Sequence, residues 1–234
     1  MSVPALPAVC ILAGGRGLRL GSLTTDLPKP MLQVAGRPFI DWPLQQLRSQ
    51  GFLEVVLLVG YRGEVLREHV GDGSRFGLRV AYSDDGPTQA GTLGAIRQAL
   101  PLLGDTVPVL YGDTYLDLDF PAVVQAHRRS DAAMTMAVMK NDGEWDTSNA
   151  VVSGDRVIAY GKNPRPPGAA WIDYGFSVVN AASVAASVDA DLADLAAGLS
   201  AAGLVAAFPA KKRFYEIGTP KALDETDRFL RSRS

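Results

Sequence analysis

The residues best suited to chemistry are two cations near the N-terminus, Arg19 and Lys29. Arg19 lies in a glycine-rich loop after the apolar run Val9–Leu12, and Lys29 stands between two prolines further along the chain. Glycines let the backbone approach a ligand closely and direct several N–H groups at it. With fixed positive charge added, this pattern suits a polyphosphate, although a surface turn with solvated cations would have the same composition. The loop residues expected to contact the ligand are Leu12, Ala13, Gly14, Gly15 and Gly17.

A carboxylate stands at a comparable position after a later apolar run, Val107–Tyr111, which ends in Gly112-Asp113. A carboxylate there is well placed to hold Mg²⁺, which prefers oxygen ligands and keeps waters and phosphates as its other partners. A helix or turn cap is the alternative role for Asp113. Because ligands of open parallel sheets bind outside the carboxyl ends of the strands, the glycine loop and Asp113 are expected at one edge.

Two further segments could contact a nucleotide base. Asp85 follows a predicted strand, and its carboxylate could accept hydrogen bonds from the N–H donors of a base edge, or it could simply be a turn residue. Gly91 and Thr92 open a predicted helix whose N–H groups could meet the base or the sugar, and a helix start without a ligand is the alternative. A second metal pair at Asp117 and Asp119 is conceivable, but Asp119 is better explained as an N-cap.

Other chemistries are disfavoured by the residues present. No set of nucleophile and base is visible, and the only histidines, His69 and His127, are expected on solvated helix faces. The dinucleotide fingerprint fails because Leu20 stands where its third glycine belongs, and the Gly-Lys-Ser/Thr P-loop is absent. Cations, glycine N–H groups and an acidic metal ligand without a nucleophile suit direct in-line displacement at phosphorus.

The elements that must position these residues alternate in type along the first half of the chain. Near-continuous apolar strands separated by helices predict a mostly parallel central sheet with helices on both faces, of the Rossmann-like α/β class. Strands are predicted at Val9–Leu12, Glu54–Val59, Leu78–Ser83, Val107–Tyr111 and Ala133–Val138. Helices are predicted at Pro38–Gln50, Gly63–Val70, Gly91–Leu100 and Phe120–Ser130.

The second half has a different character and predicts a small mixed β part. Further strands are predicted at Asn149–Ser153, Arg156–Tyr160, Trp171–Val179 and Phe214–Ile217, and helices at Asp191–Ala202 and Pro220–Arg233. We therefore expect one domain, 1–234, in which residues 1–140 bind a nucleotide and residues 141–234 cover a second ligand.

Composition limits the partners. The chain has 234 residues, 47% hydrophobic residues and a net charge of −2, as expected for a globular protein without a basic field that recruits nucleic acid. No apolar run approaches the ~20 residues that a membrane span needs. The N-terminus lacks the order of a secretory signal, so a cytoplasmic location is expected. The single cysteine, Cys10, is expected to be buried and inert.

Taken together, several motifs resemble the sugar-1-phosphate nucleotidyltransferases. The resemblance rests on Leu12-Ala-Gly-Gly-Arg-Gly-Leu-Arg19, on Leu27-Pro-Lys-Pro-Met31, on Val34-Ala-Gly-Arg-Pro38 and on Gly112-Asp113. It extends from Ala8 to about Phe229, and within the family the sequence is most similar to short bacterial enzymes of the D-glycero-D-manno-heptose 1-phosphate guanylyltransferase type. The resemblance implies an enzyme that joins a nucleoside triphosphate to a sugar 1-phosphate and releases pyrophosphate.

The resemblance also implies roles for individual residues. Arg19 would grip the triphosphate, Lys29 would contact the phosphates at the reacting centre, and Asp113 would bind Mg²⁺. Glu216 falls where the family usually has a second metal-binding aspartate, and Asp85 falls in the segment that reads the base. The residues expected to bind the sugar phosphate are Lys162, Asp173 and Gly175.

Four departures from the family pattern affect these expectations. Leu18 replaces a threonine of the phosphate loop, and Gly161 replaces the glutamate that commonly precedes the sugar-phosphate lysine. Leu93 places a bulkier side chain beside the base or sugar, and Glu216 reaches about one methylene further than aspartate. Because the arginine, the lysine and both carboxylates remain, an active enzyme is expected.

The substrates are less sharply defined than the reaction. A carboxylate at Asp85 could accept from guanine N1–H and N2–H₂ together, which favours GTP, but it could also accept from adenine or cytosine. The sugar could be a heptose, a hexose or a cyclitol. A glycosyltransferase that uses Asp117 and Asp119, and a non-catalytic nucleotide-sensing module, are the competing hypotheses. Family resemblance alone suggests a homodimer.

Overall fold

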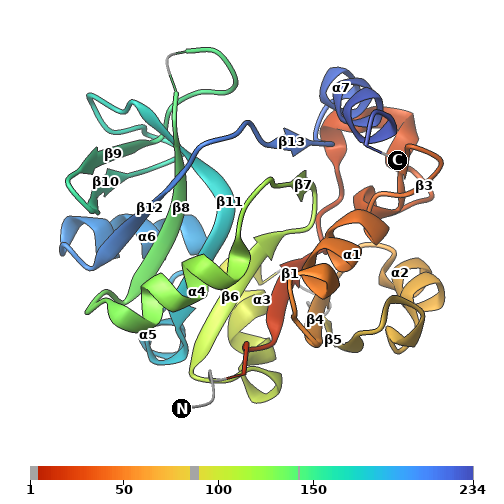
Figure 1. Cartoon of the computed structure of the whole chain (residues 1–234), viewed down its shortest axis with the longest axis horizontal. Coiled ribbons are helices and arrows are strands. Elements are labelled where there is room, and N and C mark those ends of the chain that lie inside the picture. The colour runs from red at the N-terminus through yellow and green to blue at the C-terminus, as the bar shows by residue number, and fades with distance from the viewer. Residues whose placement is uncertain (1–4, 85–89, 142, 234) are drawn as a thin grey trace.

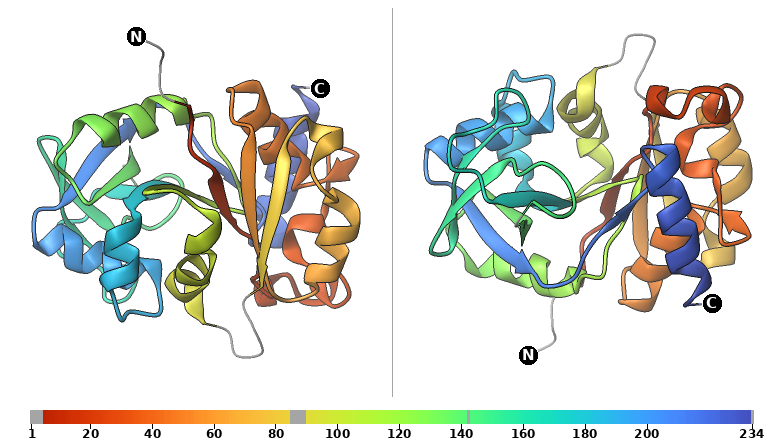
Figure 2. Two further views of the ribbon diagram at one scale, coloured as in Figure 1. Left: turned by 90° about the horizontal axis from the view of Figure 1, so that it is seen from below. Right: turned by 90° about the horizontal axis from the view of Figure 1, so that it is seen from above.

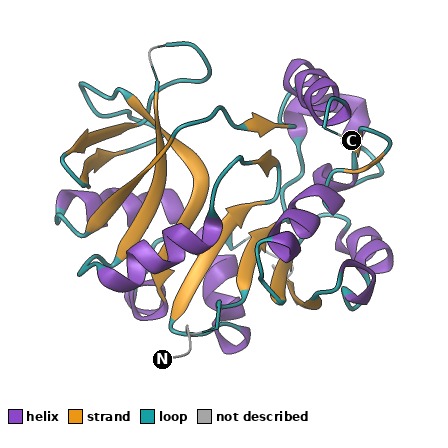
Figure 3. Cartoon of the chain, in the orientation of Figure 1, coloured by secondary structure: helices purple, strands orange, loops and turns teal. Residues whose placement is uncertain are grey.

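The computed structural model describes residues 5–84, 90–141 and 143–233 (Figure 1). Helices and strands alternate along most of the chain (Figure 3). The strands are β1 (Val9–Leu12), β2 (Gln33–Val34), β3 (Arg37–Pro38), β4 (Glu54–Val59), β5 (Arg79–Asp84), β6 (Thr106–Tyr111), β7 (Thr114–Tyr115), β8 (Met134–Lys140), β9 (Ala150–Ser153), β10 (Arg156–Tyr160), β11 (Trp171–Asn180), β12 (Val205–Ala210) and β13 (Tyr215–Glu216). The α-helices are α1 (Asp41–Ser49), α2 (Gly63–Val70), α3 (Gly91–Ala99), α4 (Phe120–Arg129), α5 (Ala181–Ala186), α6 (Leu192–Ala201) and α7 (Pro220–Arg231). Short 3₁₀ turns occupy η1 (Leu18–Thr24), η2 (Lys29–Met31), η3 (Ser74–Phe76) and η4 (Leu100–Leu102).

One sheet of nine strands runs through both halves of the chain, in the order β5-β4-β1-β6-β11-β8-β12-β10-β9. The strands β5, β4, β1 and β6 are parallel, as predicted. Beyond β6 the sheet is mixed: β11 pairs antiparallel with both β6 and β8, whereas β12 pairs parallel with β8. The strand predicted at Ala133–Val138 therefore does not extend the parallel set. The mixed strands of the second half therefore continue the same sheet, which joins the two halves through β6 and β11.

Helices cover both faces of this sheet, and Figure 2 shows α4 and α3 on opposite sides of it. One core cluster packs α1, α2 and α4 against alternate strand residues such as Val9 and Ile11. The other packs α3, α5 and α6 against the intervening residues, including Cys10. Both faces of the central strands are buried, which explains their near-continuous apolar sequence. Burial also raises the pKa of the Cys10 thiol, as expected for an inert cysteine.

The C-terminal segment returns to the first half of the chain. Strand β13 pairs antiparallel with β7, which directly follows Asp113, and α7 lies beside the β2–β3 hairpin (Figure 1). A small core cluster that includes Val34, Phe39, Ile217 and Leu230 fixes this arrangement. Glu216 is thereby carried to the strand end at which the glycine loop begins.

Most predicted elements have bounds within a few residues of the observed ones. For β1, β4, α2 and β10 the predicted and observed bounds are identical. The elements without a counterpart in the prediction include β12, α5 and the two-residue strands β2, β3 and β7. Alanine and Pro209 dominate β12, and both residue types are depleted in strands. Its pairing with β8 shows that tertiary context overrides this local preference.

The prediction for the two histidines is wrong. His127 is only 4% exposed, and its ring nitrogens lie 3.0 Å from Thr135 Oγ1 and 3.0 Å from Asn180 Oδ1. His69 is largely covered and lies 2.7 Å from Asp41. Both rings are thus part of structural hydrogen-bond networks.

Within the described residues, no helix combines the length and apolar character needed to cross a bilayer.

Candidate active site

The glycine loop is fixed by the ends of three parallel strands. Ala13 N–H donates to Leu58 O of β4 over 2.9 Å, and Gly112 N–H donates to Leu12 O over 3.0 Å. A Cβ added at Gly112 would lie 2.5 Å from Leu12 O, so this close approach requires glycine. The loop after β1 and the Gly112-Asp113 pair after β6 therefore lie side by side, as predicted from the parallel topology.

The loop turns at Gly17, which has a φ of 62°. Thr24 Oγ1 donates to Gly17 O over 3.1 Å and closes the 3₁₀ turn that carries Arg19. The loop and its neighbours enclose a cavity of about 530 Å³. The predicted nucleotide-binding residues that line it are Leu12, Ala13, Gly14, Gly15, Gly17, Gly91 and Thr92.

Three charged groups gather where this cavity meets the next one. Lys29 Nζ donates to Asp113 Oδ2 over 2.5 Å, and its side chain is only 11% exposed. The prolines on either side hold Lys29 in a short 3₁₀ turn. Arg19 lines the same cavity, and its guanidinium forms no hydrogen bond or ion pair with any described residue. Its donors are therefore free for an anionic ligand.

Glu216 lies beside Asp113 through backbone pairing. Ile217 N–H donates to Asp113 O over 3.0 Å, and Glu216 pairs with Thr114 across β13 and β7. Burial and then the neighbouring charge of Asp113 raise the pKa of the Glu216 carboxyl, against the opposing effect of a 2.6 Å hydrogen bond from Gly218 N–H. A cation between the two carboxylates would relieve this repulsion.

The two carboxylates fit a divalent metal. They provide the oxygen ligands that Mg²⁺ prefers, and the Lys29 ammonium already occupies a position where positive charge is favoured. No three His, Cys, Asp or Glu side chains cluster as a metal site among residues 5–84, 90–141 and 143–233. Any remaining ligands would come from phosphates and water, as is usual for Mg²⁺.

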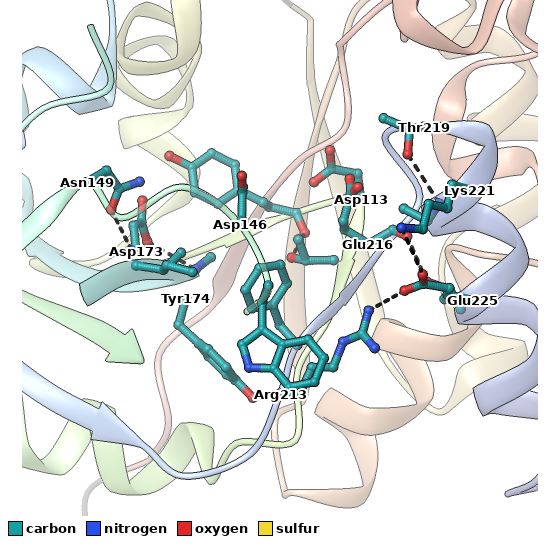
Figure 4. Close-up of a pocket in the computed structure, with 18 of the residues that line it drawn as sticks. Asp113, Asp146, Asn149, Asp173, Tyr174, Arg213, Glu216, Thr219, Lys221 and Glu225 are labelled. Atoms are coloured by element: carbon teal, nitrogen blue, oxygen red, sulfur yellow. Dashed lines mark hydrogen bonds and ion pairs between the residues drawn. The ribbon is translucent and has the colours of Figure 1, made fainter. Parts of the chain in front are cut away.

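A second cavity, of about 500 Å³, opens on the other side of Asp113. Figure 4 shows Asp113 and Glu216 near its middle, with Asn149 and Asp173 on one side and Lys221 and Glu225 on the other. The predicted sugar-phosphate residues Lys162, Asp173 and Gly175 all line it. The structure thus brings the described residues expected to bind the triphosphate, the metal and the sugar phosphate to one of two adjoining cavities, which share Arg19, Tyr111 and Asp113.

The Asp173 carboxylate is held by the protein itself. Oδ1 accepts from Gly175 N–H over 3.0 Å, and Oδ2 accepts from Tyr160 OH over 3.0 Å. Desolvation lowers the pKa of Lys162, but the proximity of Tyr111 and Asp173 outweighs this effect, so the pKa is raised and the ammonium stays charged. Burial, together with the charge of Asp173, raises the pKa of Tyr111 to about 12.

The outer wall of the second cavity joins segments that are far apart in the sequence. The Arg213 guanidinium lies 4.4 Å from the ring centre of Trp145 and 4.7 Å from that of Tyr215, and it pairs with Glu225 of α7. Sequence analysis gave no role to Trp145, Arg213, Glu225 or Gly218, since no local pattern links them.

Two expectations about the nucleotide pocket need correction. The N–H groups that follow Gly91 in α3 are not free for a ligand, because Thr92 N–H donates to Asp191 Oδ1 and Leu93 N–H donates to Ala190 O. Thr92 could therefore contact a nucleotide by other atoms only. Leu93 lies on the face of α3 that packs on the sheet, is fully buried there and does not crowd a base or sugar. Asp85 lies outside the described residues.

Other departures have visible structural reasons. Leu18 is 82% exposed at the rim of the loop. A Cβ at Gly161 would lie 2.6 Å from Pro164 O, so the usual glutamate would require the chain to move. Asp117 pairs with Lys212 and Arg233, and Asp119 caps α4 at Ala122 N–H. Neither aspartate lines the two cavities, which contradicts the second metal pair.

Comparisons with known proteins identify the family. The model of the nucleotidyl transferase family matches residues 8–161. The N-acetylmuramate alpha-1-phosphate uridylyltransferase of Neisseria meningitidis is 45% identical over 116 residues, which cover 49% of this chain and 50% of that protein. The D-glycero-alpha-D-manno-heptose 1-phosphate guanylyltransferase of Campylobacter jejuni is 39% identical over 150 residues, with 64% and 66% covered. The chain thus spans about half to two thirds of the length of these curated relatives.

Solved structures support the fold. HddC from Yersinia pseudotuberculosis superimposes with a TM-score of 0.81 at 23% identity, over 96% of this chain and 100% of that one. A putative glucose-1-phosphate thymidylyltransferase from Bacillus anthracis gives a TM-score of 0.84 at 19% identity, over 96% and 95%. At these identities the likeness concerns the fold alone. From its family match, its fold and the site at the strand ends, the chain belongs to the nucleotidyl transferase family.

Proposed function

We propose that this protein transfers a nucleoside monophosphate from a nucleoside triphosphate to a sugar 1-phosphate, forming a nucleoside diphosphate sugar and pyrophosphate. The observation that carries the proposal is the meeting of two cavities at Arg19 and Asp113, with Lys29 paired to Asp113. One cavity has the glycine loop and cations that suit a triphosphate. The other has Lys162 and polar groups that suit a sugar phosphate.

In this proposal the triphosphate occupies the cavity of the glycine loop. Arg19 and Lys29 bind its phosphates, and Arg19 has unpaired donors for them among the described residues. Lys162 binds the phosphate of the sugar from the opposite cavity, beside Gly175 and the fixed carboxylate of Asp173. The two phosphate-binding groups then face a common centre at Asp113.

Asp113 and Glu216 would hold Mg²⁺, which neutralises phosphate charge and helps orient the triphosphate when it is bound. A phosphate oxygen of the sugar forms the new bond to the α-phosphorus. The bond from that phosphorus to the bridging oxygen of the β-phosphate breaks, and pyrophosphate leaves with the bonding electron pair. Arg19 and Lys29 stabilise the charge that develops, so positioning and electrostatics supply most of the catalysis.

For the base we propose GTP. Two relatives that align over 64% of this chain, from Campylobacter jejuni and Aneurinibacillus thermoaerophilus, are named as guanylyltransferases of a heptose 1-phosphate. UTP is the second candidate, because the relative that is 45% identical is named as a uridylyltransferase. For the sugar, a heptose or hexose type follows from the same names.

The test is a matrix of pyrophosphate release with GTP, UTP, CTP, ATP and dTTP against several sugar 1-phosphates. We include the glucose, mannose, N-acetylmuramate and D-glycero-α-D-manno-heptose compounds. The expected result is metal-dependent release with GTP and one sugar, which Arg19→Ala should reduce. The matched surface change Arg228→Ala should leave it intact, since the exposed Arg228 pairs with Asp224 on α7. No release by any pair, together with unaltered triphosphate binding by Arg19→Ala, would contradict the proposal and favour a nucleotide-sensing module.

A further inference from the structure

The two cavities share three residues, and one of them has no role in the proposed reaction. Arg19 and Asp113 are assigned to the triphosphate and the metal, whereas Tyr111 is unassigned. Tyr111 is the last residue of β6 and directly precedes Gly112-Asp113. Its position at the boundary means that its side chain can reach ligands in both cavities.

The ring of Tyr111 packs beside strand β11. Strand β6 pairs with β11, and a Cβ added at Gly175 would lie 3.5 Å from Tyr111 Cδ2, which is an ordinary van der Waals distance. The Lys162 ammonium lies on the ring as well, 4.8 Å from its centre. A ring that is packed in this way loses little further conformational freedom when it binds a ligand.

The hydroxyl of Tyr111 has an unused proton. Lys162 Nζ donates to the phenol oxygen over 3.3 Å, and the same ammonium lies 4.8 Å from the ring centre. Among the described residues, no acceptor lies within hydrogen-bonding distance of the Tyr111 O–H. An O–H group that accepts from a cation is polarised and becomes a stronger donor.

The chemistry of the acceptor makes a donor more useful here than a base. A phosphate monoester is already anionic near neutral pH, so its oxygen needs no base to attack phosphorus. It needs charge stabilisation and a fixed orientation, which two converging donors provide.

We propose that the Tyr111 hydroxyl donates a hydrogen bond to a phosphate oxygen of the sugar 1-phosphate and, with Lys162, orients it for attack. Tyr111 is then a catalytic residue of the proposed reaction, on which this inference rests. The Lys162 ammonium and the Tyr111 hydroxyl act as a coupled pair.

The test uses Tyr111→Phe, which keeps the ring and removes the hydroxyl. For the pair that the parent turns over, KM for the sugar 1-phosphate should rise about tenfold or more, as for loss of a hydrogen bond to a charged group. KM for the triphosphate should change less than twofold. In a Lys162→Ala background, Tyr111→Phe should raise KM for the sugar 1-phosphate by a smaller factor than it does in the parent, because the polarising ammonium is already absent.

Tyr82→Phe, on edge strand β5, is the matched control. It deletes a phenol that donates to Gly71 O, and it should leave both KM values unchanged. Equal thermal unfolding of parent and Tyr111→Phe excludes a folding defect. An unchanged sugar KM, a shift confined to the triphosphate KM, or full additivity with Lys162→Ala would overturn the proposal.

Calorimetric titration with the four sugar 1-phosphates separates this inference from the proposed function. If the parent releases no pyrophosphate, the proposed function fails on its own. Weaker sugar 1-phosphate binding by Tyr111→Phe than by the parent would still support the hydrogen bond. Equal binding, or no binding of any of the four compounds by the parent, would overturn it.

Discussion

The ammonium of Lys29 lies 2.5 Å from Oδ2 of Asp113, although the two residues are 84 positions apart in the sequence. The pair brings the proposed phosphate-binding cation and the proposed metal ligand into direct contact. In the free protein the partly exposed Asp113 carboxylate neutralises the Lys29 ammonium, whose side chain is only 11% exposed, and this avoids an isolated buried charge. When a metal and phosphates bind, Asp113 would contact the metal and Lys29 would contact a phosphate in place of each other. The ion pair therefore holds both groups at the site before the ligands bind.

Lys29→Ala should lower kcat by about 100-fold or more, because a fixed cation at the reacting phosphates is lost. Steady-state pyrophosphate release measures this effect. Lys140→Ala, at the exposed end of β8, is the control and should leave kcat unchanged. A Lys29→Ala protein with parental kcat would remove Lys29 from the proposed chemistry.

Glu216→Gln should raise the Mg²⁺ concentration needed for half-maximal activity by about tenfold or more, because one of two anionic ligands becomes neutral. Chelation of the metal should abolish pyrophosphate release, and added Mg²⁺ should restore it. Glu54→Gln changes an exposed carboxylate on β4 and should leave the Mg²⁺ dependence unaltered. Identical Mg²⁺ curves for Glu216→Gln and the parent would contradict the assignment.

The part of the site that the sequence predicted follows from parallel strands. Apolar runs that end in a glycine loop or in Gly112-Asp113 must meet at the carboxyl edge of the sheet, and the Lys29–Asp113 contact depends on that meeting. Glu216 was reached only through resemblance, because a two-residue strand such as β13 carries no periodic signal. Arg213 and Trp145 could not be paired, since their contact depends on where distant loops pack.

The fold, like the site, was predictable from the sequence in its parallel part only. Local periodicity defined the strands of the parallel half, but it contains no information on which partner a strand chooses. The antiparallel pairing of β11 with β6 therefore appeared only in the structure. Tyr111 did have a local signal, since it directly precedes Gly112-Asp113, yet its use depends on Lys162, which is brought near by the return of the chain through β10.

Gly218→Ala should reduce kcat by at least about tenfold. An added Cβ would lie 2.2 Å from Glu216 Oε2 and 3.0 Å from Arg19 Nη2, so both proposed functional groups would have to move. Displacing these groups at a reacting centre lowers the rate, because the catalysis depends on their positions. Gly104→Ala is the matched control, because a Cβ there meets nothing within 4 Å. Parental kinetics for Gly218→Ala would show that neither group needs its present position.

His127 should make stability depend on pH. Burial lowers its pKa, against the opposing effect of its hydrogen bond to Asn180, so the folded protein holds the neutral ring while the unfolded chain titrates at ~6.5. As pH falls below that value the unfolded state binds more protons, and stability declines by up to ~1.4 kcal/mol per pH unit until the folded ring is protonated. Denaturant unfolding between pH 7.5 and pH 5.5, chosen on the basis of these pKa values, measures this slope. His127→Gln should have a flatter dependence, and equal slopes would refute the assignment.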